Sequence, residues 1–226
     1  MLYSNITEGV FISRPNRFIA HVLIDGEPVI AHVKNTGRCK ELLLPGARIW
    51  LNKGDTPGRK TDWDLISVES NGQIVNIDSQ VPNQVAKDYL QHLFPDAHIR
   101  REVTFGDSRF DLVLERDGQK PTYVEVKGVT LKVGNEARFP DAPTARGAKH
   151  LRGLIHAKEQ GFGAMLLFIV AMGHVDVVKP NYATDPVFAS TIKDAYLAGV
   201  EIMAVDCEVT ENEIKFRNKL AVNVTD

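Results

Sequence analysis

Two short apolar runs on either side of an Asp-Gly pair constrain the fold of this chain more than any other stretch. The first run ends at Glu115, the second begins at Tyr123, and Asp117-Gly118 lies between them. An Asp-Gly pair flanked by apolar runs is the strongest short-range signal for a β-hairpin. We therefore predict two neighbouring strands, over residues 110–115 and 123–127.

Three charged side chains of this hairpin are candidate active-site residues. Asp111 lies on the first strand, whereas Glu125 and Lys127 are two residues apart on the second and share one face of it. Mg²⁺ or Mn²⁺ is held by one or two carboxylates together with substrate phosphates and waters. A lysine beside the metal can orient a water or stabilise charge on a phosphate. The pattern is typical of a metal-dependent phosphodiesterase.

The same pattern also has structural explanations. An acidic residue two positions before a lysine is common on solvated strand faces, and Glu213-Ile214-Lys215, which we predict to be an exposed edge, is a second example in this chain. Lys127 could also simply neutralise the two carboxylates. Replacing Asp111 would then alter stability alone.

Length and charge are those of an ordinary water-soluble protein. With 226 residues and a formal charge of −2, the chain suits one or two domains, and a wholly basic nucleic-acid coat protein is excluded. Cys39 and Cys207 stand far apart without metal-ligand neighbours, which indicates reduced structural thiols. The longest apolar run, residues 164–172, is too short to span a bilayer, and no signal-peptide pattern precedes it. We expect a cytoplasmic protein without a membrane partner.

Residues 9–78 alternate between apolar and polar positions in short stretches, with turns at Asp25-Gly26 and Asn71-Gly72. Four or five strands with one brief helical piece near residues 38–43 predict a five-stranded oligonucleotide-binding (OB) barrel. Its rim would carry these candidate DNA-binding residues: Arg14, Arg17, Lys34, Arg38 and Lys40. Stacking aromatics are sparse there, and a solvated loop explains the same residues.

The pattern changes near residue 82. Asn83 is a plausible N-cap for a helix ending before Pro95, and strands then follow at 98–105, 110–115 and 123–127. Further along we predict a helix at 145–160, strands at 165–171 and 174–178, a helix at 186–198 and a strand at 201–206. This order predicts a mixed sheet with helices on both faces. We place an all-β domain at residues 1–82 and an α/β domain at 83–226.

The helix over residues 145–160 is a candidate phosphate-binding element. Arg146, Lys149, His150 and Gly153 would share the side opposite its apolar stripe. Residues 127–158 hold seven Lys or Arg and two acidic residues, which favours a DNA backbone beside the carboxylates over a merely solvated face. Residues 132–144 look like a loop and a candidate lid, and Pro140-Asp141, which follows Glu125, we treat as a false nuclease motif.

Several separated stretches resemble the sugar fermentation stimulation protein A family. They are NTGRCKELLLPG at 35–46, residues 101–103 and 106–111, VEVKGVTL at 124–131, FPDAPT at 139–144, and residues 146–151. The resemblance covers nearly the whole chain. It implies an N-terminal OB-like barrel and a C-terminal domain with the restriction-endonuclease, or PD-(D/E)xK, fold. The family is described as DNA-binding and tied to the regulation of sugar metabolism.

The same resemblance implies roles for particular residues. Nucleases of that fold use an aspartate and an acid-x-lysine pair, which correspond here to Asp111, Glu125 and Lys127. A metal would be held by Asp111, Glu125 and the backbone carbonyl of Val126. Many such enzymes also place a glutamate on the first core helix, where this chain offers only Asp88.

Two functions therefore remain open. The chain is either a DNA-binding protein with an Mg²⁺-dependent or Mn²⁺-dependent deoxyribonuclease domain, or a non-catalytic DNA-binding regulator that uses the nuclease scaffold as a clamp. In both cases Arg109, beside Asp111, joins the cations above as a candidate DNA contact. The sequence does not indicate an oligomeric state.

Overall fold

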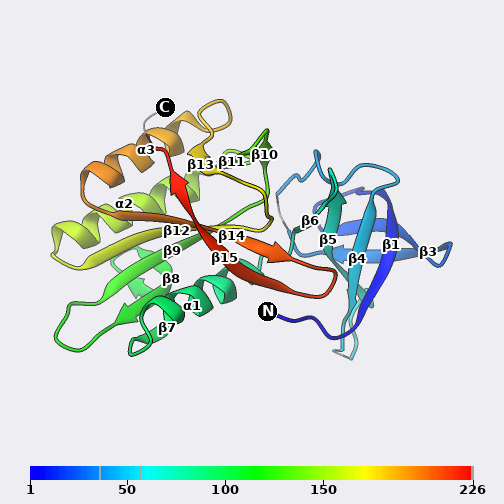
Figure 1. Ribbon diagram of the computed structural model, residues 1–226, viewed down its shortest axis with the longest axis horizontal. Helices are drawn as coiled ribbons and strands as arrows, with labels where there is room; N and C mark the ends of the chain where they lie inside the picture. Colours follow the sequence, from blue (N-terminus) through cyan, green and yellow to red (C-terminus); the bar gives the residue numbers. More distant parts are fainter. Residues whose placement is uncertain (36, 56, 225–226) are drawn as a thin grey trace.

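A computed structural model describes residues 1–35, 37–55 and 57–224. Two sheets organise these residues, one in the blue-to-cyan part of the chain and one in the remainder (Figure 1). The predicted architecture, an all-β barrel followed by a mixed α/β domain, is confirmed. The division at residue 82 itself stays a prediction. No helix among the described residues has the length and apolar character needed to cross a membrane.

The N-terminal sheet forms a closed barrel, as expected. Its strands are β1 (Ile6–Ser13), β2 (Ile19–Ile24), β3 (Glu27–Val33), β4 (Arg48–Lys53), β5 (Trp63–Ser70) and β6 (Gln73–Asn76). The order β3-β2-β1-β4-β5 closes through a parallel pairing of β3 with β5, and β6 extends the sheet beyond β5. Inward positions such as Ala20 and Val22 alternate with exposed neighbours, which produces the apolar interior.

The prediction of a brief helix near residues 38–43 is wrong. Instead, the backbone N–H groups of Leu42 and Leu43 both donate to the carbonyl of Cys39, at 3.2 and 2.9 Å, in a compact turn. Cys39 has a φ of +45°, which an α-helix does not allow. The thiols of Cys39 and Cys207 are buried and free, and burial raises the pKa of each to about 12. They are structural, as predicted.

The C-terminal sheet is mixed. Its elements are α1 (Val81–Leu93), β7 (His98–Phe105), β8 (Ser108–Glu115), β9 (Thr122–Val129), β10 (Lys132–Val133), β11 (Glu136–Phe139), α2 (Ala145–Glu159), β12 (Gly163–Val170), β13 (Val177–Pro180), α3 (Pro186–Leu197), β14 (Glu201–Val209) and β15 (Ile214–Val222). The strand order is β10-β11-β13-β15-β14-β12-β9-β8-β7, with β9, β12 and β14 parallel.

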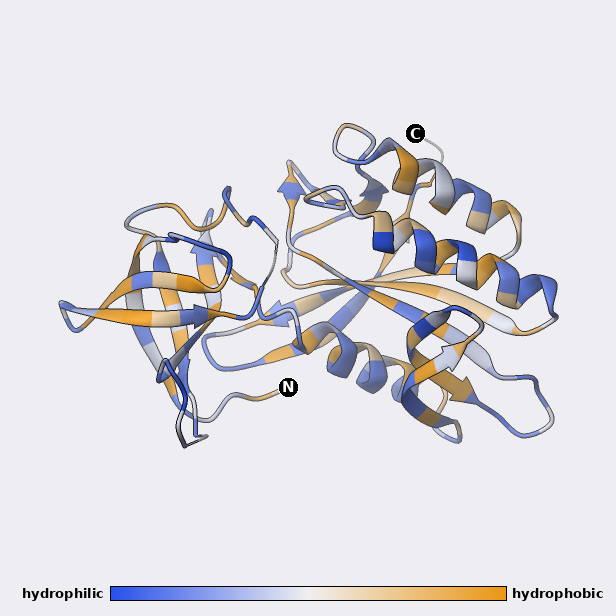
Figure 2. Cartoon of the chain, turned by 180° about the vertical axis from the view of Figure 1, so that it is seen from behind, coloured by the Kyte–Doolittle hydropathy of each residue, from blue (hydrophilic) through white to orange (hydrophobic). Residues whose placement is uncertain are grey.

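Helices cover both faces of this sheet. Helix α1 packs against one face with Val85 and Leu90, whereas α2 and α3 pack against the other with residues such as Leu151 and Ile192. Apolar residues follow the central strands, and each helix alternates between apolar and polar stripes (Figure 2). The central strands, buried from both sides, are near-continuous apolar runs, as β12 illustrates.

Three local predictions for this domain are wrong. Helix α1 begins at Val81 after Gln80, so Asn83 lies in its first turn and is not the N-cap; Pro82 is tolerated there because the first N–H groups of a helix have no intrahelical acceptor. The predicted loop at 132–144 contains the short hairpin β10–β11, which pairs with β13. The segment Glu213-Ile214-Lys215 is not an exposed edge, because β14 pairs with it on one side and the N-terminal residues Met1 and Leu2 bond to it on the other.

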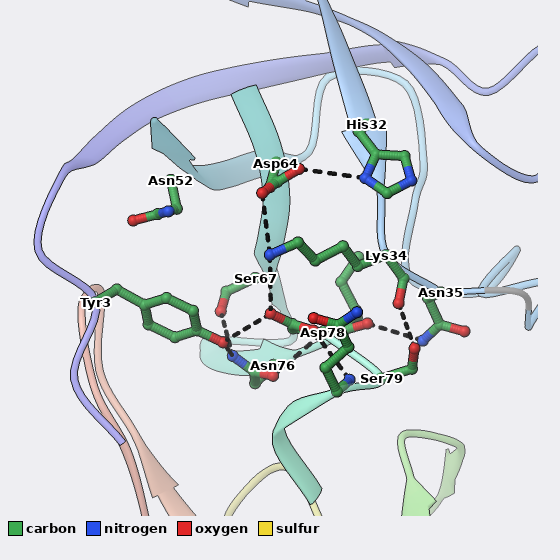
Figure 3. A network of polar contacts seen from close by, with 12 residues as sticks. Tyr3, His32, Lys34, Asn35, Asn52, Asp64, Ser67, Asn76, Asp78 and Ser79 are labelled. Atoms are coloured by element: carbon green, nitrogen blue, oxygen red, sulfur yellow. Dashed lines mark hydrogen bonds and ion pairs between the residues drawn. The ribbon is translucent and has the colours of Figure 1, made fainter. Parts of the chain in front are cut away.

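A buried polar network joins the barrel to the C-terminal domain (Figure 3). Asn76 donates its backbone N–H to the carbonyl of Ala171 at 2.9 Å and its side-chain amide to the Tyr3 hydroxyl at 3.0 Å. Tyr3 in turn donates to Asp78 at 3.4 Å, and burial raises the pKa of the Asp78 carboxyl. Lys34 bridges Asp64, at 3.0 Å, and Asp78, at 3.9 Å. The network therefore holds the barrel against the start of α1.

Candidate active site

The predicted hairpin brings Asp111 to the strand that carries Glu125 and Lys127. Strands β8 and β9 are paired in register from Leu114–Thr122 to Leu112–Val124. Beyond this pairing, the next hydrogen bond that β9 donates to β8 is accepted by a side chain. The backbone N–H of Val126 donates to Asp111 Oδ2 at 2.8 Å. The carboxylate of Asp111 thus lies where the two strands part.

Asp111 has a second partner that sequence reasoning missed. The side-chain amide of Asn83, in the first turn of α1, donates to Asp111 Oδ1 at 3.0 Å. Asp88, the acid noted on this helix, is exposed and accepts from Gln84 at 2.6 Å, away from the site. Each oxygen of Asp111 keeps a further lone pair, so the carboxylate can still bind a cation.

Glu125 is the most buried charged group of the site, with 1% of its surface exposed. Its Oε1 accepts hydrogen bonds from the Lys127 ammonium and from the His150 ring. Its Oε2 is also buried, but has no hydrogen-bond partner in the described part of the chain. Buried charges are normally paired and buried polar atoms hydrogen-bonded, so this oxygen lacks the partner that its environment requires.

His150 faces inward and not toward solvent. It is 8% exposed, and the Arg146 guanidinium donates to its Nε2 at 3.4 Å. Since Nε2 accepts that bond, Nδ1 carries the hydrogen that is donated to Glu125. His150 is therefore largely buried and bonded to Glu125, and its predicted contact with DNA stays a prediction.

Gly153 also differs from its predicted role beside a phosphate. It faces β8, where a Cβ would lie 3.0 Å from the Cβ of Ser108 and 3.1 Å from the ring of Phe110. The missing side chain lets helix and sheet approach each other. Lys149, by contrast, is exposed on α2 as predicted.

Asp111, Glu125 and Lys127 line one cavity of about 450 Å³. The C-terminal domain supplies these three residues, and the barrel side supplies Asn35, Asn76, Asp78 and Ser79. Within the described residues, no group of three or more His, Cys, Asp or Glu is arranged to hold a metal. The metal site predicted at Asp111, Glu125 and the carbonyl of Val126 stays a prediction, although a carboxylate oxygen such as Oε2 of Glu125, without a partner in the described residues, is a ligand that hard cations accept.

The predicted cations fall into two groups. Arg17, Arg38 and Lys40 line a second cavity, of about 1170 Å³, on the barrel rim, and their side chains have no partner among the described residues. Lys149 on α2 is likewise without a partner in the described part of the chain, and Arg146 donates to His150. The remaining three are engaged within the protein. Arg14 donates to four backbone carbonyls, those of Arg17, Asn35, Gly37 and Arg38, Lys34 pairs with Asp64 and Asp78, and Arg109 pairs with Glu102 at 2.8 Å.

Comparisons with known proteins agree with this architecture. Residues 12–77 match the family described as the SfsA N-terminal OB domain, and residues 80–213 match the sugar fermentation stimulation protein RE domain. Sugar fermentation stimulation protein homologs from Desulfitobacterium hafniense and Clostridium perfringens are 48% and 45% identical, covering 100% and 97% of both chains. The structure of Pyrococcus furiosus SfsA in complex with Ca²⁺ is similar, with a TM-score of 0.87 and 33% identity over 99% of this chain and 98% of that one.

Proposed function

The chain belongs to the sugar fermentation stimulation protein family, and we propose that it is a DNA-binding protein with a metal-dependent phosphodiesterase site. The observation that carries this proposal is the buried, partnerless Oε2 of Glu125 in a cavity that also contains Asp111 and Lys127. Burying a carboxylate oxygen without a donor costs free energy unless a cation binds beside it. The Ca²⁺ complex of the Pyrococcus furiosus relative supports a divalent cation.

Asp111, Glu125 and the carbonyl of Val126 would hold Mg²⁺ or Mn²⁺. Such an ion would polarise the phosphodiester and lower the pKa of a bound water. The protein residues hold the two carboxylates for this task. Asn83 and the Val126 N–H orient Asp111. His150 and Lys127 both donate to Oε1 of Glu125, and no described residue donates to Oε2. Lys127 also supplies the positive charge that would position a water or stabilise the phosphate.

DNA would be bound by the exposed cations near the site. Arg17, Arg38 and Lys40 on the barrel rim and Lys149 on α2 are free to contact phosphates, since their side chains have no partners within the described residues. Phosphate contacts supply affinity without reading sequence. The proposed substrate is therefore a DNA backbone and not a defined operator.

A non-catalytic DNA-binding regulator is the second candidate function, and one observation favours it. Both oxygens of Asp111 already accept hydrogen bonds, from Asn83 and from Val126. A purely structural carboxylate would be satisfied in this way. The two candidates differ in whether the site takes up a divalent cation.

Calorimetric titration with Mn²⁺ separates them. Wild type should bind the ion, and Glu125→Gln, which removes the charge at nearly constant volume, should weaken binding by at least about tenfold. Glu213→Gln is the matched control, because Glu213 belongs to an acid-x-lysine triplet outside the cavity. A circular dichroism melt checks that both variants fold. Equal Mn²⁺ uptake by wild type and Glu125→Gln would refute the metal site.

A further inference from the structure

Two cavities adjoin between the barrel and the C-terminal domain, and we refer to them together as the groove. Asn35 and Asp141 line both the 1170 Å³ cavity on the rim and the 450 Å³ cavity at the carboxylates. Asp141, the residue of the false nuclease motif, thus lies where the two spaces meet. The groove leads from the barrel rim to Glu125.

Both domains supply walls along the whole groove. On the rim, barrel residues that include Arg17, Arg38 and Lys40 face residues 139–144. At the carboxylates, Asn76, Asp78 and Ser79 face α1, β8 and β9. The two sides come into close contact at Gly37, where a Cβ would lie 2.7 Å from the Asp141 carboxylate. Access to Glu125 is therefore bounded by protein on two sides.

Charge along the groove is unequal. Arg17, Arg38 and Lys40 line the rim end without partners in the described part of the chain. At the inner end the carboxylates of Asp78, Asp111, Glu125 and Asp141 outnumber the cations Lys127 and Arg146. Cations at the rim would attract a phosphate backbone. The acidic inner end would accept a phosphate only together with a cation.

We propose that the groove takes single-stranded DNA, bound over the barrel rim by Arg17, Arg38 and Lys40 and led between the domains to the carboxylates. This inference rests on the proposed function and names the substrate class of the same site. Duplex DNA is stiff, with a persistence length of about 50 nm, and cannot easily turn into a groove with walls from two domains. A single strand is flexible, and OB barrels bind such strands with cationic loops.

Few aromatic side chains line this groove. Phe11 and Phe139 are the aromatics that line the rim cavity, and Phe11 is buried. Stacking of bases would therefore contribute little, and binding would depend mainly on backbone charge. Affinity should consequently be tolerant of sequence and steeply dependent on salt.

Fluorescence anisotropy with the full chain in Ca²⁺ tests this. The probes are a labelled single strand of about 20 nucleotides and the blunt duplex of the same sequence. Wild type should bind the single strand about tenfold or more tightly than the duplex. The triple variant Arg17→Ala, Arg38→Ala, Lys40→Ala should abolish this preference. It should also reduce the slope of log K against log salt by about 0.7 for each lost phosphate contact, about 2 in total.

The control removes equal charge elsewhere. Lys60, Lys193 and Lys219 are exposed and line neither cavity, so their triple alanine variant should keep the preference. Equal or tighter binding of the duplex, or an unchanged single-strand affinity in the groove variant, would overturn the inference. Metal uptake by Glu125 is measured separately by calorimetry. If the strand preference fails, the proposed metal site is unaffected. If metal uptake is absent, the strand preference is still decided by the anisotropy experiment.

Discussion

The two carboxylates of the site differ in how their oxygens are hydrogen-bonded. One oxygen of Glu125 accepts from Lys127 and His150, and the other has no donor within the described residues. Both oxygens of Asp111 accept hydrogen bonds, from Asn83 and from Val126. Groups that orient a metal ligand typically matter nearly as much as the ligand itself. Under the proposed function Asn83 would be such a group, since it donates to Asp111.

Replacing Asn83 with alanine tests this role. Asn83→Ala removes the donor to Asp111 Oδ1, so Mn²⁺ affinity should fall by about 10-fold to 100-fold while the melting temperature changes little. Calorimetry and a thermal melt give the two readouts. Gln84→Ala removes a neighbouring amide of α1 that contacts Asp88 and should leave Mn²⁺ affinity unchanged. Equal affinities for Asn83→Ala and Gln84→Ala would contradict the assignment.

At the residue level, the sequence predicts local geometry well and distant partners poorly. The meeting of Asp111 with the Glu125 strand followed from an Asp-Gly turn, because a hairpin is a short-range structure. Asn83 reaches Asp111 only because α1 packs across β8 and β9, which no local pattern encodes. Helical spacing places His150 with Arg146 and Lys149 opposite the apolar stripe of the helix, whereas the structure buries it against Glu125.

Among the elements, α2 connects the site to the core, and its start is held by α3. The side chain of Thr144 accepts from the N–H of Gly147 at 3.0 Å, which caps α2. Asp185, the N-cap of α3, accepts from the N–H groups of Phe188 at 2.9 Å and Thr144 at 2.7 Å. One carboxylate therefore holds the first turns of both helices.

Asp185→Ala should destabilise the protein by about 1–3 kcal/mol, since it removes a cap and leaves a backbone N–H unpaired. Burial alone would raise the pKa of Asp185, but the N–H groups of Thr144, Phe188 and Val187 outweigh it and lower the pKa. A lowered pKa means that this stabilisation is present above about pH 4 and is lost as pH falls through the folded-state value. Urea unfolding at pH 7 and pH 3 should thus show a smaller difference between variant and wild type at pH 3. A constant difference would contradict the role of the charge.

The close packing at Gly153 leads to a second prediction for the stability of α2. Alanine favours helices over glycine by about 1 kcal/mol, yet Gly153→Ala should destabilise the protein by about 1–3 kcal/mol because its methyl group would meet Ser108 and Phe110. Arg152→Ala, at an exposed position of the same helix, should be nearly neutral. Urea denaturation measures both. A stabilised Gly153→Ala variant would show that α2 does not need this close approach.

The bounds of the helices and strands were mostly predictable from the sequence, whereas the residues that each helix buries were less so. The predicted helix at 145–160 differs from α2 by one residue, because a glycine marks its end. Its buried face was misjudged at Gly153, since a hydrophobic pattern counts glycine as neutral and contains no information about steric fit. The hairpin β10–β11 was missed because strands of two and four residues are too short for a periodic signal.

For the whole molecule, the buried network of Figure 3 sets how the barrel faces the C-terminal domain, and with it the groove. Asn76 is its central amide, since it donates to Tyr3 and to Ser67 and accepts from the N–H of Asp78 at 3.1 Å. The two domain folds were predictable from strand patterns and from the change near residue 82. Their relative placement was not, because no local pattern predicts that Gly37 of the barrel packs against Asp141.

Asn76→Ala should lower the free energy of unfolding by about 1–3 kcal/mol, since it leaves buried polar groups of Tyr3 and Ser67 without a donor. Asn52→Ala is the control, because the side chain of Asn52 contacts only the carbonyl of Lys53 among the bonds of the described residues. Urea unfolding compares the two. Equal stabilities would mean that the network contributes nothing to docking the barrel.

Cleavage of labelled DNA in Mn²⁺ tests the central claim most directly. Lys127→Ala removes the ammonium that contacts Glu125, and Lys215→Ala removes the lysine of the second acid-x-lysine triplet, which pairs with Glu208 outside the cavity. The account predicts that wild type and Lys215→Ala cut the strand, that Lys127→Ala does not, and that all three bind it. Equal cutting by wild type and Lys127→Ala, or binding by all three without any cutting, would contradict a phosphodiesterase site at Asp111, Glu125 and Lys127.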